Sequence, residues 1–154
     1  MFQLSIFVLL MTVSERAFTE PSIENAWHCK TTYDVGEFQN VIDHHINFDS
    51  NGKYSFSTSI SFVDTNSKKS ELLAFVDGDY SFQNDLLEYK NVKNVDIQIK
   101  SDELNILTSG SIDELKDMLK QNSDSKYATL KLSNEIWISQ DSVSGEKITC
   151  FKKK

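Results

Sequence analysis

Histidine side chains are the groups of this chain best suited to chemistry. An imidazole titrates near neutral pH, binds transition metals, and both donates and accepts hydrogen bonds. The chain has three of them, His28, His44 and His45. Neighbouring residues of a strand point to opposite faces, so His44 and His45 are not placed to share one ion. We therefore expect no metal site.

His44 alternates with Ile42 and Ile46, which places it on the apolar face of a predicted strand. On that face its ring could hydrogen-bond the polar head of a ligand inside the fold. A core histidine whose hydrogen bonds are satisfied by the protein is the commoner case. Both interpretations stay open, and His28, beside Cys29, is expected to face outward.

An acidic cluster around Gly78 superficially resembles a calcium-binding loop. Its members are Asp77, Asp79 and Asp85. A calcium loop of this kind needs glycine at its sixth position for a sharp turn, and here that position is Phe82. The cluster is therefore interpreted as an acidic turn.

Local motifs for catalysis are absent from the sequence. It contains no Gly-x-Ser-x-Gly, no His-Glu-x-x-His, no P-loop and no Gly-x-Gly-x-x-Gly. The neighbouring carboxylates Asp102 and Glu103 lie in a polar segment, where we expect them to stay solvated. We expect a noncatalytic protein without a cofactor.

The charge pattern argues against a nucleic-acid partner. The formal net charge is −7, Arg16 is the only arginine, and the lysines are scattered apart from residues 152–154. A nucleic-acid site usually shows a stripe of basic residues with interleaved aromatics. The scarcity of arginine also removes the usual bidentate clamp for phosphate or carboxylate ligands.

Residues 4–13 are an uninterrupted run of apolar or small side chains. The run is shorter than a bilayer span, which takes about 20 such residues, and is typical of a signal peptide, although Arg16 follows it instead of preceding it. We expect residues 1–19 to be a signal peptide and residues 20–154 to be one domain without a membrane span, secreted or periplasmic. The alternative is that residues 4–13 form a buried strand of a cytosolic domain.

Cys29 and Cys150 are the only cysteines, and they lie near the two ends of the predicted domain. In a secreted chain such a pair favours a disulfide, and two unrelated buried thiols are the alternative. Both cysteines fall in segments with the period of a strand. First and last strands that touch are what a closed barrel needs.

Alternating apolar and polar residues dominate the domain and predict antiparallel strands joined by short turns. The clearest strand covers residues 53–62, where aromatic and serine residues alternate. Gly78 interrupts the segment 71–82, which indicates a bulge, and residues 95–99 are interpreted as a strand of their own. The remaining predicted strands cover residues 27–33, 41–48, 86–92, 127–132, 135–139 and 147–152.

One segment changes to a helical period. Ser111 followed by Glu114 is a capping box, and Ile112, Leu115 and Leu119 then share one face. We predict a short helix near residues 112–121. The fold class is mainly β, a small antiparallel meander barrel of about eight strands with this one helix.

Several short segments resemble bacterial lipocalin-like (calycin) domains. They are Ala26-Trp27-His28-Cys29, residues 46–54, residues 77–80 and the hairpin from Ile136 to Cys150. The resemblance covers most of the predicted domain, and it implies a barrel whose interior could hold one small apolar ligand. The residues best placed to line such an interior are Trp27, Tyr33, His44, Tyr54, Phe56 and Phe62.

We therefore expect a monomeric, noncatalytic protein that binds a small apolar or amphipathic molecule inside a barrel. The alternative is an envelope protein-binding module or inhibitor that uses the acidic turns at residues 64–70 and 141–146. A filled barrel favours the protein-binding role, whereas a hollow barrel with His44 inside favours a ligand.

Overall fold

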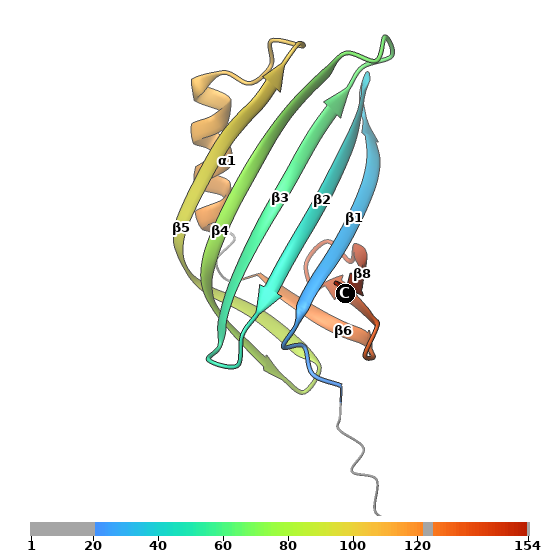
Figure 1. Cartoon of the computed structure of the whole chain (residues 1–154), viewed down its shortest axis with the longest axis vertical. Helices are drawn as coiled ribbons and strands as arrows, with labels where there is room; N and C mark the ends of the chain where they lie inside the picture. Colours follow the sequence, from blue (N-terminus) through green and yellow to red (C-terminus); the bar gives the residue numbers. More distant parts are fainter. Residues whose placement is uncertain (1–20, 122–124, 154) are drawn as a thin grey trace, which may run out of the picture.

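The computed structural model describes residues 21–121 and 125–153, which form eight antiparallel strands and one helix (Figure 1). Each strand pairs with the next along the chain and the last pairs with the first, so the sheet closes into a meander barrel. The predicted fold class is confirmed, while the predicted signal peptide lies outside the described residues. The elements are β1 (Ala26–Val35), β2 (Phe38–Phe48), β3 (Lys53–Val63), β4 (Lys69–Gln83), β5 (Leu86–Asp102), α1 (Ser109–Gln121), β6 (Lys126–Leu132), β7 (Ile136–Asp141) and β8 (Lys147–Lys152).

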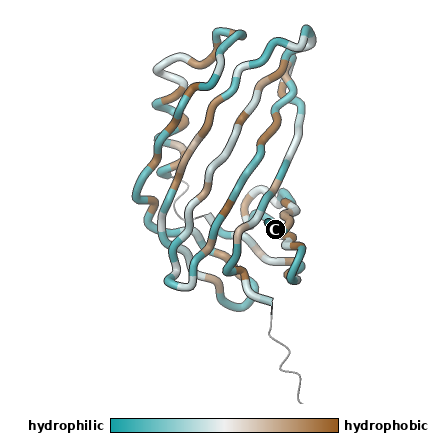
Figure 2. Tube along the Cα trace, in the orientation of Figure 1, coloured by the Kyte–Doolittle hydropathy of each residue, from teal (hydrophilic) through white to brown (hydrophobic). Residues whose placement is uncertain are grey.

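Alternation along the strands decides which side chains face the interior. On β4, Leu72, Ala74 and Val76 are each at most 2% exposed. On β3, Tyr54 is buried while its neighbour Ser55 is exposed. Figure 2 shows hydrophobic and hydrophilic residues interspersed along the strands, as a sheet with one wet face requires.

The barrel closes through two short seams. β5 pairs with β6 only over Leu86, Leu87 and Glu88, and β1 pairs with β8 only over three residues beginning at Trp27. Pairing among β1, β2, β3 and β4 extends along most of each strand. The barrel is therefore closed at one end, and at the other end the first five strands continue as a curved sheet (Figure 1).

The helix α1 packs against β5, the strand that extends beyond its partner β6 (Figure 1). The predicted cap is wrong, because the Thr108 hydroxyl oxygen accepts a hydrogen bond from the Ser111 amide at 3.2 Å, so the helix starts at Ser109. The Ser111 hydroxyl instead donates to the carbonyl oxygen of Thr108 at 2.8 Å. No helix in the described part of the chain is long and apolar enough to cross a membrane.

The separate strand predicted at residues 95–99 is part of β5, which runs unbroken from Leu86 to Asp102. The bulge predicted at Gly78 lies instead on β5, because Asp77 pairs with Asn94 and Asp79 with Lys90, which leaves the extra residues on β5 opposite Gly78. Within this bulge, Asn91 has a positive φ of 48°, a conformation that asparagine tolerates better than most residues. One local irregularity therefore bends a continuous strand.

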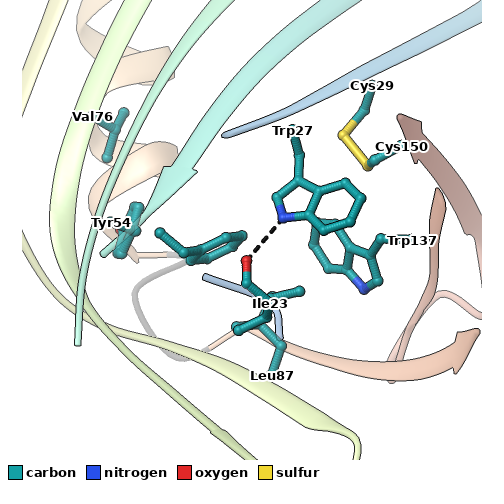
Figure 3. Close-up of a cluster of buried hydrophobic side chains, with 9 residues drawn as sticks. Ile23, Trp27, Cys29, Tyr54, Val76, Leu87, Trp137 and Cys150 are labelled. Carbon is teal, nitrogen blue, oxygen red and sulfur yellow. Dashed lines mark hydrogen bonds between the residues drawn. A yellow bond between two sulfur atoms is a disulfide. The ribbon is translucent and has the colours of Figure 1, made fainter. Parts of the chain in front are cut away.

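Cys29 and Cys150 face each other across β1 and β8 and form the predicted disulfide, with their Cα atoms 4.2 Å apart. Trp27 and Trp137 pack beside it with ring centroids 5.9 Å apart. The Trp27 indole N–H donates to the carbonyl oxygen of Ile23 at 2.8 Å, which ties the segment before β1 to the core (Figure 3). The disulfide and the two indoles fill the closed end of the barrel.

The disulfide joins residues separated by 121 positions, so it removes much chain entropy from the unfolded state, by about 4 to 5 kcal/mol in the simplest model. We predict that Cys29→Ser lowers the thermal midpoint of the oxidised protein by about 10 °C or more. Calorimetry measures the shift. Under reducing conditions the variant and the wild type should melt alike, and equal midpoints under oxidising conditions would contradict the prediction.

Glu88 supports the short β5–β6 seam through ion pairs with Lys90 at 2.8 Å and Lys126 at 2.9 Å. Hydrogen bonds from these two lysines lower the pKa of Glu88 to about 2. An unfolded glutamate titrates near about 4.3, so the ion pairs stabilise the fold above that pH, and the stabilisation is lost as the pH falls toward 2.

We predict that Glu88→Gln lowers the thermal midpoint at about pH 6, and that most of its difference from wild type is lost as the pH falls to about 2. Calorimetry across this range measures both midpoints. Glu114→Gln, an exposed change on α1, is the matched control and should leave the midpoint unchanged. A constant difference at every pH would show that Glu88 acts through packing and not through charge.

Candidate ligand-binding cavity

The barrel interior contains a cavity of about 180 Å³ just above the two tryptophans of the closed end. All eight strands and the helix contribute to its walls, and the disulfide forms part of them. The lining residues are Cys29, His44, Ile46, Tyr54, Phe56, Val76, Tyr89, Val92, Leu119, Ser125, Tyr127, Trp137, Ser139, Ile148 and Cys150.

Three tyrosines supply polar groups to a wall that is otherwise mostly apolar. The rings of Tyr54 and Tyr89 lie 4.8 Å apart, and those of Tyr89 and Tyr127 lie 5.7 Å apart. Burial raises the pKa of Tyr54 to about 12 and also raises the pKa values of Tyr89 and Tyr127. All three phenols therefore keep their protons at neutral pH and act as hydrogen-bond donors.

None of these three hydroxyl groups has a hydrogen-bond partner among the described residues. A phenol buried without a partner costs free energy, so such groups normally find one. Hydroxyl groups that face a hollow can be satisfied by whatever fills it. The three tyrosines line the cavity, so their hydroxyl groups are candidate donors to an occupant.

His44 is the one imidazole of the cavity wall. Its Nδ1 lies 2.6 Å from the Thr58 hydroxyl oxygen, and its ring meets Phe56 edge-on. Burial lowers the pKa of His44 to about 4, so the ring is neutral at neutral pH. When the Thr58 hydroxyl donates to Nδ1, the ring proton lies on Nε2, which has no partner in the described part of the chain and becomes a further donor.

The six residues expected to line an interior divide into three groups. His44, Tyr54 and Phe56 line the cavity. Trp27 belongs to the solid core below it. Tyr33, which is 41% exposed, and Phe62 face inward at the open end of the barrel, outside the cavity.

The open end carries its own polar feature. Asn40 pairs in register with Tyr33 on one side and Phe62 on the other, and it is buried. Its Oδ1 is the buried side-chain polar atom in the described residues that lacks a hydrogen-bond partner. This atom and its two register partners lie outside the cavity of the closed end.

Several lining residues escaped the sequence reasoning, among them Tyr89, Tyr127 and Leu119. Alternation in residues 86–92 places Tyr89 on the same face as Leu87, so the sequence alone could have shown that the two side chains point the same way. The inward direction of that face depends on the shifted register beside Gly78, which periodicity does not reveal. Leu119 reaches the cavity only because α1 packs on β5.

Two of the acidic side chains considered in the sequence, Asp79 and Asp102, form ion pairs or hydrogen bonds outside the cavity. Asp79 forms ion pairs with Lys53 and Lys93, and hydrogen bonds from these lysines hold its pKa well below the usual range. The Asp102 carboxylate accepts a hydrogen bond from the Ser70 hydroxyl at 2.7 Å and others from two backbone amides. Asp102 is therefore an anchor for the turn after β5 and not a freely solvated group.

Comparison with known proteins finds no protein-family model that matches the chain and no curated protein similar to it in sequence. The properties of the cavity therefore have to be argued from its own residues.

Gly78 allows the Tyr54 ring to lie flat against β4. A Cβ at position 78 would lie 2.8 Å from Tyr54 Cε1 and 2.9 Å from its hydroxyl oxygen, closer than real contacts allow. We predict that Gly78→Ala displaces the ring and lowers the free energy of unfolding by about 1 to 3 kcal/mol. Urea unfolding and the near-ultraviolet circular dichroism of the tyrosines measure both effects.

Gly110→Ala on α1 is the control, because a Cβ there meets nothing closer than 3.9 Å. It should leave the tyrosine signal unchanged and slightly favour the helix. An unaltered tyrosine signal in Gly78→Ala would contradict the described position of Tyr54.

Proposed function

We propose that the protein is a secreted or periplasmic, noncatalytic carrier or receptor for one small amphipathic molecule held in the barrel. The observation that carries this proposal is a largely apolar cavity lined by three tyrosines and His44, whose three hydroxyl groups and Nε2 atom have no partner within the described residues. Ligand sites generally combine apolar walls with a few convergent polar groups. The resemblance to lipocalin-like domains supports the same role.

Cavity volume limits the size of the ligand. A cavity of about 150 Å³ can hold benzene, and drug-sized molecules need about 300 Å³ or more. The volume here, about 180 Å³, lies just above the lower figure. It suits a molecule built on a single ring or a short branched chain, and it excludes a complete long-chain fatty acid.

The charges and hydrogen-bond donors of the cavity wall limit the chemistry of the ligand. Among the described residues, the cavity wall contains no lysine, arginine, aspartate or glutamate, so a charged ligand group would be buried without a counter-ion from these residues, at high cost. The phenols and the neutral imidazole instead offer donors. The preferred ligand is therefore uncharged, with an aromatic or aliphatic body and one hydrogen-bond acceptor such as a carbonyl or hydroxyl oxygen.

The disulfide supports the proposed location, because disulfides persist mainly in oxidising compartments such as the periplasm or the extracellular space.

The alternative role, a protein-binding module acting through the acidic turns, has weaker support. The Asp64 and Asp141 carboxylates accept hydrogen bonds from backbone amides within their own turns, so they serve to shape those turns.

Native mass spectrometry of the full chain, expressed with its own leader and then denatured, tests the proposal first. We expect a folded mass that exceeds the denatured mass by one small molecule, and identification of the released compound. Bare protein that also binds none of a panel of phenols, indoles and short ketones in calorimetric titrations would contradict it.

We predict that Val76→Phe fills the cavity and weakens the binding of a one-ring ligand at least about tenfold, since the added ring takes up the space that the ligand needs. Phe75→Leu is the matched control, because Phe75 is the next residue of β4 and points outward. Calorimetric titration with the released molecule, or with phenol, measures both. Unchanged affinity in Val76→Phe would exclude this cavity as the binding site.

A further inference from the structure

The outer face of β1 and β2 brings together two histidines and an aspartate. His28 and His45 are directly opposite in the strand register, and Asp43 lies two residues before His45 on the same face. The Nε2 atoms of His28 and His45 lie 2.9 Å and 3.3 Å from the same oxygen of Asp43. His44, between the two β2 residues, points the other way into the cavity.

The arrangement has the dimensions of a metal site. Three potential ligand atoms, one from each side chain, all lie within 4.8 Å of one another. A tetrahedral ion with bonds of about 2.0 to 2.2 Å holds its ligand atoms about 3.3 to 3.6 Å apart. The two distances between nitrogen and oxygen already approach this value, so only small side-chain rotations are needed.

The three side chains are held in position before any ion arrives. The two imidazole rings stack with centroids 4.6 Å apart and planes 9° apart, so their nitrogens face the same carboxylate. Lys30 is the register partner of Asp43, yet the ion-pair partners of Asp43 in the described part of the chain are the two imidazoles. The Asp43 carboxylate therefore stays available to a cation.

We infer that His28, Asp43 and His45 form a surface binding site for a divalent transition metal ion of the Zn²⁺ or Cu²⁺ type. Two imidazole nitrogens and one carboxylate oxygen match the ligand preferences of these ions. The side chains are between 32% and 44% exposed, which leaves the remaining coordination position to water or to a ligand from outside. The site lies on the opposite face of the sheet from the cavity and is independent of the proposed function.

Calorimetric titration of the oxidised full-length protein with Zn²⁺ at neutral pH tests the inference. We expect one ion per chain, and at least about tenfold weaker binding in each of His28→Gln, His45→Gln and Asp43→Asn, because removing a direct ligand should cost no less than removing an outer partner. Asp34→Asn is the matched control, an exposed carboxylate on the same face of β1. It should bind like the wild type.

Cu²⁺ gives a second readout that a merely structural role would not change. Electron paramagnetic resonance of the bound ion should show two nitrogen ligands in the wild type and one in His28→Gln. Near-ultraviolet circular dichroism confirms that each variant is folded. Absence of stoichiometric Zn²⁺ binding in the wild type, or tight binding that survives in the double variant His28→Gln/His45→Gln, would overturn the inference.

Discussion

The pairing of β1 with β8 covers three residues of each strand, and the disulfide between Cys29 and Cys150 spans its last pair. A seam this short contributes few hydrogen bonds, each worth about 1 kcal/mol net. The covalent link holds the two ends of the sheet together where the hydrogen bonds alone are few. Because both cysteines also line the cavity, the same crosslink that closes the barrel forms part of the wall of its proposed binding site.

The cavity exists because the interior is filled unevenly. At the closed end two indoles, a disulfide and Leu87 pack solidly. The residues that line the cavity above them include the small side chains of Ser139 and Val76. The larger tyrosine rings also lie in the cavity wall and leave space between them. Filling the space with an apolar side chain would leave the phenols unsatisfied, so an occupant with an acceptor suits this interior better than a tighter apolar core.

Alternation in the sequence was enough to predict the barrel and the inward faces of β2 and β3, and the number and placement of the cysteines predicted the disulfide. It placed six side chains on inward faces: His44, Tyr54, Phe56, Trp27, Tyr33 and Phe62. It could not show that only the first three line the cavity, because a period of two gives the face of a strand and not the height along the barrel axis. The outer histidine pair was missed for a related reason. His28 lies opposite His45 only because of the register between β1 and β2. Comparing His44 with His45 along one strand says nothing about which residue of the neighbouring strand lies beside either of them.

The helix α1 substitutes for a missing length of strand along β5, and none of its side chains is fully buried. Separating two paired strands breaks a ladder of hydrogen bonds, whereas lifting a helix from a sheet edge breaks only side-chain contacts such as those of Leu119. Local openings follow the least costly route. The contact between α1 and β5 is therefore the part of the barrel that opens at least cost, and such an opening leaves the strand ladders and the disulfide intact.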